Sequence, residues 1–396
     1  MSYILLFTVL GTLLFASRKL NFWKVSIGAK GNKSSEKATV NSGKPKIFQT
    51  SGEYVVPVIE PVAADFDWQK AEPFKYRPFK AAPYKMTLAI RNLEPSDLFL
   101  IEDTYLHRTN IREKVLNSKF KKNTCLLHDS AIPAVREFYD MAINFMCDRY
   151  PMYFTKSKAD NSVYNEIRKE SVPLDPYKVE DPETLLLALG KTLEEDYLIL
   201  LKNGPEGEEG EYYLRAGISG FPAGFDPSQK FNMKLSDIHG PVPMYQSKLK
   251  LSMNKFFSRI NPGQFVIRNN WSVQAHCKLF AVTENHAPQN EIIEAMDGSQ
   301  MDFNKVLLRV ERQCLTRLPN TRANVFVIRT YLTPVTYVKD EGLGEELCGA
   351  IDGLPDVIKQ YKRAEAWGPA VKKFMTDEEI GLTGETYMPE ILAADL

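Results

Sequence analysis

The strongest constraint on the fold is a change in hydrophobic pattern that occurs near Asp181. Beyond this point, short runs rich in β-branched and aromatic residues alternate with turn residues, a pattern typical of antiparallel strands. The runs lie at 196–202, 212–217, 264–273, 276–282, 304–311 and 324–335. We expect the first two to form a hairpin, and 290–296 to be a helix between the later strands.

Before Asp181, apolar residues recur at helical spacing instead. Segment 132–150 shows this best and stops before Pro151, which cannot continue a helix. We also expect a short and then a charged helix over 93–118, a capped helix from Asp181, and an amphipathic helix over 349–374. The predicted fold class is α+β, with a helical N-terminal half and an antiparallel sheet flanked by helices. The predicted parts are a mainly helical part (55–180), a β-rich domain (181–340), and a C-terminal helix and tail (341–396).

Composition narrows the classes of function. Fifty basic residues balance fifty acidic ones, and no RNA- or DNA-binding motif occurs, so nucleic acid is not an expected partner. The five cysteines are scattered and include no Cys-x-x-Cys pair, which argues against a disulfide framework, a zinc finger or an iron–sulfur site within the chain. A reducing compartment fits this pattern best.

The N-terminal segment differs in character from the rest. Residues 3–16 carry no charge and are followed at once by Arg18 and Lys19. The run is shorter than the roughly 20 residues of a spanning helix, although apolar residues up to Trp23 could extend it. We expect 1–22 to be a membrane anchor or hydrophobic leader and 23–54 a basic flexible linker. The charges after the run would leave the folded part in the cytosol; a soluble cytoplasmic protein is the alternative.

His239 is the most distinctive of the five histidines. It lies in the sequence IHGPVP at 238–243, where two prolines stiffen the backbone and a glycine leaves room beside the imidazole. This setting suits an axial ligand of a flat cofactor, but also a turn histidine bonded to the backbone. His276 follows a strand-like run and could lie on either face. The remaining three, His107, His128 and His286, are expected to be exposed.

A dense set of charges occupies 309–319. Period-two alternation places Glu311 on one strand face with Arg309 and Gln313, and Arg312 on the other. The pattern is typical of a solvated face with salt bridges. The alternative is a pocket carboxylate with guanidinium groups that clamp an anionic cofactor. A separate Asp-x-Asp at 65–67 leaves a membrane-tethered glycosyltransferase as a further alternative, although such pairs are more often simply exposed.

Spaced motifs from about residue 74 to residue 331 carry a resemblance to a known family. They are YRPFK at 76–80, YKMT at 84–87, RYP at 149–151, FP at 221–222, IHGPVP at 238–243, RNNW at 268–271, ERQ-x-L-x-RLP at 311–319 and F-x-IRTY at 326–331. Taken together and in this order, they resemble the haem-dependent oxidative N-demethylases.

The resemblance implies a PAS-like haem-binding domain over 181–340 that uses haem b and dioxygen to oxidise a small secondary amine. It implies electrons from a separate NADPH-dependent flavin and iron–sulfur reductase. Carried over residue by residue, it makes His239 the iron ligand, with His276 the next candidate, and Glu311 the catalytic carboxylate. Arg268, Arg312 and Arg317 would bind the haem propionates. A non-catalytic haem sensor or carrier on the same fold is the alternative.

Overall fold

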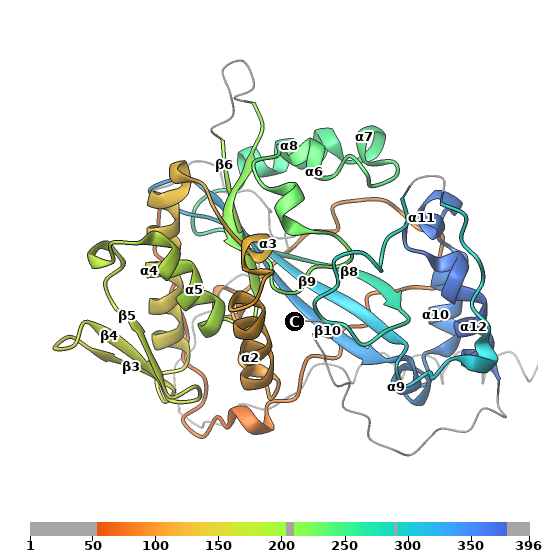
Figure 1. The fold of residues 1–396 in the computed structure, drawn as a ribbon, viewed down its shortest axis with the longest axis horizontal. Coiled ribbons are helices and arrows are strands. Elements are labelled where there is room, and N and C mark those ends of the chain that lie inside the picture. The colour runs from red at the N-terminus through yellow and green to blue at the C-terminus, as the bar shows by residue number, and fades with distance from the viewer. Residues whose placement is uncertain (1–53, 203–209, 289–290, 378–396) are drawn as a thin grey trace, which may run out of the picture. The chain divides into compact units, whose positions relative to one another are not determined.

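The computed structural model describes residues 54–202, 210–288 and 291–377, all within one compact unit, Lys46–Leu396 (Figure 1). The predicted anchor at 1–22 and all of the predicted linker except Tyr54 lie outside the described residues. Within the described ranges, no helix combines the length and apolar character needed to span a bilayer.

A seven-stranded antiparallel sheet forms the centre, in the order β1-β8-β9-β10-β6-β7-β2. Its strands are β1 Arg91–Asn92, β2 Cys125–Leu127, β6 Asp196–Leu201, β7 Tyr213–Ile218, β8 Val266–Gln274, β9 Leu307–Arg317 and β10 Asn324–Pro334. β9 and β10 pair along their whole lengths. Five predicted strands and the β6–β7 hairpin are therefore confirmed. The edge strands β1 and β2 are too short for a sequence pattern to indicate them.

A second, three-stranded antiparallel sheet lies in the part predicted to be mainly helical. It consists of β3 Phe154–Ser157, β4 Ser162–Asn165 and β5 Glu170–Pro173. Asn161 and Lys169 hold the two turns with positive φ angles of 49° and 57°. The description of 55–180 as mainly helical is therefore incomplete, because these strands are too short to show a clear period.

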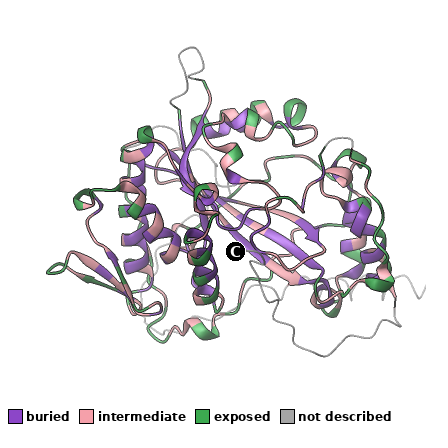
Figure 2. Ribbon diagram, in the orientation of Figure 1, coloured by how far each residue is buried: buried purple, intermediate pink, exposed green. Residues whose placement is uncertain are grey.

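Helices cover both faces of the large sheet. α2 Tyr105–Leu116, α4 Ile132–Arg149 and α5 Pro182–Thr192 contribute to an apolar core that includes Val325 and Val327 of β10. α7 Tyr245–Lys248 and α8 Lys250–Arg259 share a second core with Phe326, which points the opposite way because strand side chains alternate. In the chain, the short helix α3 Lys121–Thr124 follows α2, and the short helix α6 Leu235–Ile238 precedes α7. Figure 2 shows that the central strands are mostly buried.

The C-terminal region forms four helices, whereas the sequence predicted one amphipathic helix over 349–374. They are α9 Val335–Asp340, α10 Gly344–Asp352, α11 Asp356–Tyr361 and α12 Ala364–Thr376. Pro355 follows α10, and Arg363 has a φ of 54° between α11 and α12, so one continuous helix is not possible. These helices share a core with Leu308 and Val310 of β9.

Two other predictions in this half of the chain are wrong. Residues 276–282 do not form a strand; Ala281 makes an isolated bridge with Ala223. Residues 291–296, the described part of the predicted helix, are not helical. Ile292 in this segment is 90% exposed, so this apolar residue does not pack on the core as it would on the buried face of a helix. The predicted cap at Asp181 is confirmed, because its carboxylate accepts a hydrogen bond from the Glu183 amide.

A buried ionic cluster joins the sheet to the helices. The fully buried guanidinium of Arg329 on β10 pairs with Glu102 at 3.0 Å, Glu194 at 2.7 Å and Glu195 at 3.1 Å. Nearby, Arg108 of α2 lies 3.4 Å from Glu194, and Arg112 of α2 donates to Asp196 at 2.9 Å. Each of these side chains is at least nine-tenths buried. Removing one partner would leave charges without solvent or counter-ion.

Replacing Arg329 with methionine should reduce the free energy of unfolding by about 3–5 kcal/mol, because three buried carboxylates lose their shared cation. Urea unfolding of the full-length protein measures this change. Lys169→Met is the control: it breaks an exposed pair with Glu166 and should leave the unfolding midpoint near that of the wild type. Equal midpoints for Arg329→Met and the wild type would contradict the prediction.

Candidate functional site

Glu311 lies in the middle of β9, and its carboxylate is held by three neighbours. Arg309 Nε lies 3.5 Å from Oε1, Gln313 Nε2 donates to Oε2 at 2.9 Å, and Asn270 Nδ2 donates to Oε2 at 3.4 Å. Asn270 is the direct partner of Glu311 on β8. The predicted shared face of Arg309, Glu311 and Gln313 is thus confirmed. The Glu311 side chain is 14% exposed, so this face is not a solvated one.

The surroundings of Glu311 favour its charged form. Burial alone would raise the pKa of this carboxyl group, but Arg309 and the amides of Asn270 and Gln313 lower it by more. The net pKa lies below its ordinary value, so Glu311 is an anion at neutral pH. A fixed and ionised carboxylate can hold a cationic ligand.

Two further cations lie within electrostatic range of Glu311. Arg268 lies on β8 opposite Gln313 of β9. The Nε atom of Arg268 is buried and has no hydrogen-bond partner. Lys362 follows α11, donates from Nζ to the Trp271 carbonyl, and lies 5.6 Å from the centroid of the Trp271 ring. Burial and the nearby Arg268 lower the pKa of Lys362 to about 8, although Glu311 opposes this shift. Glu311, Arg309, Arg268 and Lys362 therefore form a patch with three positive charges and one negative charge.

His286 belongs to the same patch, contrary to the expectation that it is exposed. Its half-buried ring stacks on Tyr361, with 4.4 Å between the ring centroids and 26° between the planes. Burial, Lys362 and Arg309 lower the pKa of His286 to about 4, while Glu311 opposes them. No sequence signal indicates His286 or Lys362, because they come from an irregular segment and a helix end far from β9 in the chain.

His239 follows α6, and its imidazole has a defined tautomer. Nδ1 lies 2.9 Å from the Leu235 carbonyl, which can only accept, so Nδ1 carries the hydrogen and Nε2 the lone pair. The ring stacks on the buried Tyr245 at 5.2 Å between centroids. Among the described residues, Nε2 makes no hydrogen bond. Burial lowers the pKa of His239, and Arg268 lowers it further, which places these two groups in electrostatic range of each other.

His276 has neither ring nitrogen available. Nε2 lies 2.8 Å from Asn285 Oδ1, and Nδ1 accepts from the Lys278 amide at 3.2 Å. Ligation of a metal would require one of these bonds to break. No group of three or more His, Cys, Asp or Glu residues that could hold a metal ion occurs in the described ranges. A haem iron with one histidine ligand needs no such group.

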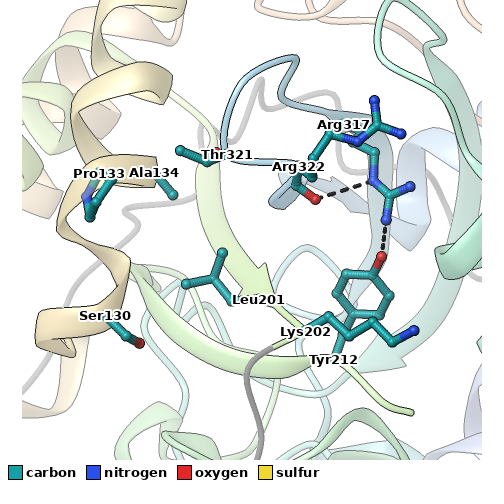
Figure 3. Close-up of a pocket in the computed structure, with 9 residues that line it drawn as sticks. All are labelled: Ser130, Pro133, Ala134, Leu201, Lys202, Tyr212, Arg317, Thr321 and Arg322. Carbon is teal, nitrogen blue, oxygen red and sulfur yellow. Dashed lines mark hydrogen bonds between the residues drawn. The ribbon is translucent and has the colours of Figure 1, made fainter. Parts of the chain in front are cut away.

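Arg312 and Arg317 lie away from Glu311. Arg312 is on the opposite face of β9, where it donates to the carbonyls of Asp97 and Leu98. Arg317 is six residues along the strand, about 20 Å from Glu311. It donates to the Arg322 and Ile260 carbonyls and to the Tyr212 hydroxyl, beside a hollow of about 470 Å³ (Figure 3). The structure therefore groups Arg268, but not these two arginines, with Glu311.

The titration of His286 predicts a pH dependence of stability. The pKa is about 4 in the folded protein and about 6.5 in an unfolded chain. As the pH falls through this window, the unfolded chain takes up a proton that the folded protein does not, so stability decreases and does not return below pH 4. One such proton contributes a slope of up to about 1.4 kcal/mol per pH unit.

His286→Phe keeps a ring against Tyr361 but removes this titration. We expect urea unfolding measured across the window to show a shallower loss of stability in the variant than in the wild type. Parallel pH profiles would show that His286 does not titrate abnormally.

One comparison with known proteins bears on this site. The family described as haem-dependent oxidative N-demethylase, alpha subunit-like, matches residues 89–372, more than half of the chain. The matched region contains His239, Arg268, Glu311 and Lys362, and all but the first two sequence motifs noted above. The match confirms the resemblance that the motifs indicated. This chain belongs to the haem-dependent oxidative N-demethylase, alpha subunit-like, family.

Proposed function

We propose that this protein oxidises a small secondary amine with dioxygen, using haem b and electrons from a separate reductase. Membership of a haem-dependent oxidative demethylase family supports the general chemistry. The observation that favours it most strongly is the geometry of His239: its Nδ1 is tied to a backbone carbonyl, which leaves Nε2 as a ligand. A metal-binding histidine needs this arrangement, because the second ring nitrogen must be held for the first to be oriented.

The residues present fit a haem group in two further respects. Arg268 has a buried Nε without a partner, which suits a carboxylate of the cofactor. The patch has excess positive charge, which an anionic cofactor would neutralise. His239 is preferred to His276 as the iron ligand, because both ring nitrogens of His276 are already bonded. The propionate role predicted for Arg312 and Arg317 draws no support from their contacts, and the PAS-like description of the domain stays a prediction.

When bound, haem supplies an iron that activates dioxygen for oxidation of the amine. Glu311 would hold the protonated amine, since its carboxylate is ionised and kept in place by Asn270 and Gln313. A carboxylate with a lowered pKa is a better charge partner than a base, so binding and orienting the amine is its main role. Accepting a proton from the amine is its second role.

The proposed oxidation needs a supply of electrons. The sequence has no Cys-x-x-Cys pair and no common nucleotide-binding motif, so we assign this task to a separate NADPH-dependent flavin and iron–sulfur reductase. The membrane anchor at 1–22 stays a prediction from the sequence.

The alternatives have less support. A haem sensor or carrier would not need an ionised, oriented carboxylate such as Glu311 beside the cofactor patch. For a glycosyltransferase, Asp67 would have to bind a metal, but its carboxylate caps a helical turn at the Gln69 amide and pairs with Lys70 at 2.7 Å.

His239→Ala should lose haem or change the position of its Soret absorption band, because the alanine removes the proposed iron ligand. The measurement is the absorption spectrum of the purified protein after titration with haem, with circular dichroism to show that the fold persists. His276→Ala is the matched control and should bind haem as the wild type does. A normal spectrum in His239→Ala together with an altered one in His276→Ala would reverse the assignment.

Glu311→Gln preserves shape but removes the charge that holds the amine. Amine-dependent oxygen consumption should fall by a factor corresponding to about 2–4 kcal/mol of transition-state stabilisation, as for the loss of one preorganised electrostatic contact. Haem content should be retained, because Glu311 does not hold the cofactor. Glu341→Gln, which affects only a distant pair with Arg77, should keep both properties. Full activity in Glu311→Gln would exclude the proposed role, and loss of haem as well as activity would make Glu311 structural.

A further inference from the structure

Three cations lie within electrostatic range of Glu311, and among the residues that the structure describes only one of them has a carboxylate partner. Arg309 pairs with Glu311 at 3.5 Å. Within the described part of the chain, the guanidinium of Arg268 makes no hydrogen bond or ion pair, and its Nε is buried without a partner. Lys362 Nζ has one backbone carbonyl as its acceptor and no carboxylate. Both side chains are only partly exposed to solvent, so their charges are incompletely compensated without a counter-ion.

We propose that Lys362 and Arg268 together form a binding subsite for carboxylates, and that its occupants are the two propionates of haem. The identity of the occupant rests on the function proposed above. The family resemblance implied such a role for Arg268, whereas Lys362 is assigned by the structure alone. Lys362 lies outside all the sequence motifs quoted above, and it is joined to β8 by the hydrogen bond from its Nζ to the Trp271 carbonyl.

The chemistry of the two side chains supports this assignment. A lysine ammonium has three donors, and the Trp271 carbonyl uses one, so two are available to a carboxylate. The Arg268 guanidinium has five donors, and its fork matches a carboxylate in two-point contact. Arg268 lowers the pKa of Lys362 and of His239, and Lys362 lowers the pKa of His286, so both cations act on neighbouring groups as uncompensated positive charges.

The position of the subsite is consistent with this ligand. Arg268 lies in electrostatic range of both His239 and Glu311. Arg268 is also the β8 partner of Gln313, two residues from Glu311 on the same face of β9. Neutralising Arg268 and Lys362 also benefits the amine, since a protonated amine would be repelled by two uncompensated cations near Glu311.

Binding of iron-free protoporphyrin IX and of its dimethyl ester to the full-length apoprotein tests the subsite. Fluorescence titration gives both affinities, and neither depends on iron ligation by His239. The wild type should bind the diacid about tenfold or more tightly than the diester, as expected for charge-assisted hydrogen bonds. Lys362→Met should lose about tenfold in affinity for the diacid and nothing for the diester.

Two control variants complete the test. Lys359→Met changes a lysine within α11, the helix that Lys362 follows; Lys359 lies 3.8 Å from Asp356, and the variant should bind both porphyrins as the wild type does. Lys362→Arg keeps the charge and should retain most of the affinity for the diacid. Circular dichroism of Lys362→Met shows whether it is folded, and retention of diester binding shows that its porphyrin site is intact.

Either of two results would overturn the subsite: equal affinity of Lys362→Met and the wild type for the diacid, or an equal loss of diacid and diester binding in Lys362→Met. Failure of the proposed function gives a different result, because a wild type that binds neither haem nor protoporphyrin would not be a haem protein. Normal diacid binding by Lys362→Met, with loss of haem in His239→Ala, would reject the subsite and keep the function.

Discussion

The cluster of buried charges around Arg329 joins β10, the start of β6 and α2, and so attaches a helix to the centre of the large sheet. Arg329 lies on β10, Glu194 and Glu195 lie just before β6, Asp196 is the first residue of β6, and Glu102 precedes α2. Its geometry is demanding, because each buried charge must meet a partner at hydrogen-bond distance. Once it forms, α2 and the chain before it are fixed against the centre of the sheet. The paired strands β9 and β10 then have one defined position.

β9 shows how one strand supports both the core and the candidate site. Its side chains alternate, so Arg312 points to the elements on one face and donates to the backbone at Asp97 and Leu98. On the other face, Arg309, Glu311 and Gln313 form a charged row that β8 extends with Arg268 and Asn270. The firm attachment of one face keeps the other in place. A preorganised carboxylate needs such support, because its function depends on fixed orientation.

The local pattern was sufficient where a segment is long and its period is clear. Five strands of the large sheet, α4 and the Asp181 cap follow from hydrophobic spacing and capping chemistry alone. The shared face of Arg309, Glu311 and Gln313 follows from alternation along a strand. The pattern failed where elements are short, as in β3 to β5, and where apolar residues lie in an irregular exposed segment, as at Ile292. A period cannot be recognised over three or four residues.

What the sequence by itself determined is the α+β class, the main strands, the family resemblance and the importance of His239 and Glu311 as candidates. Alternation along the strand already placed Arg312 on the face opposite Glu311, but only the tertiary structure brought Arg268 near Glu311, since the register of β8 against β9 decides which cation of β8 lies there. It alone brought Lys362 and His286 within electrostatic range of Glu311, and it alone showed which ring nitrogens of His239 and His276 are bonded. These are contacts between residues far apart in the chain. Their formation depends on how helices pack on the sheet, and no local spacing in the sequence records that packing.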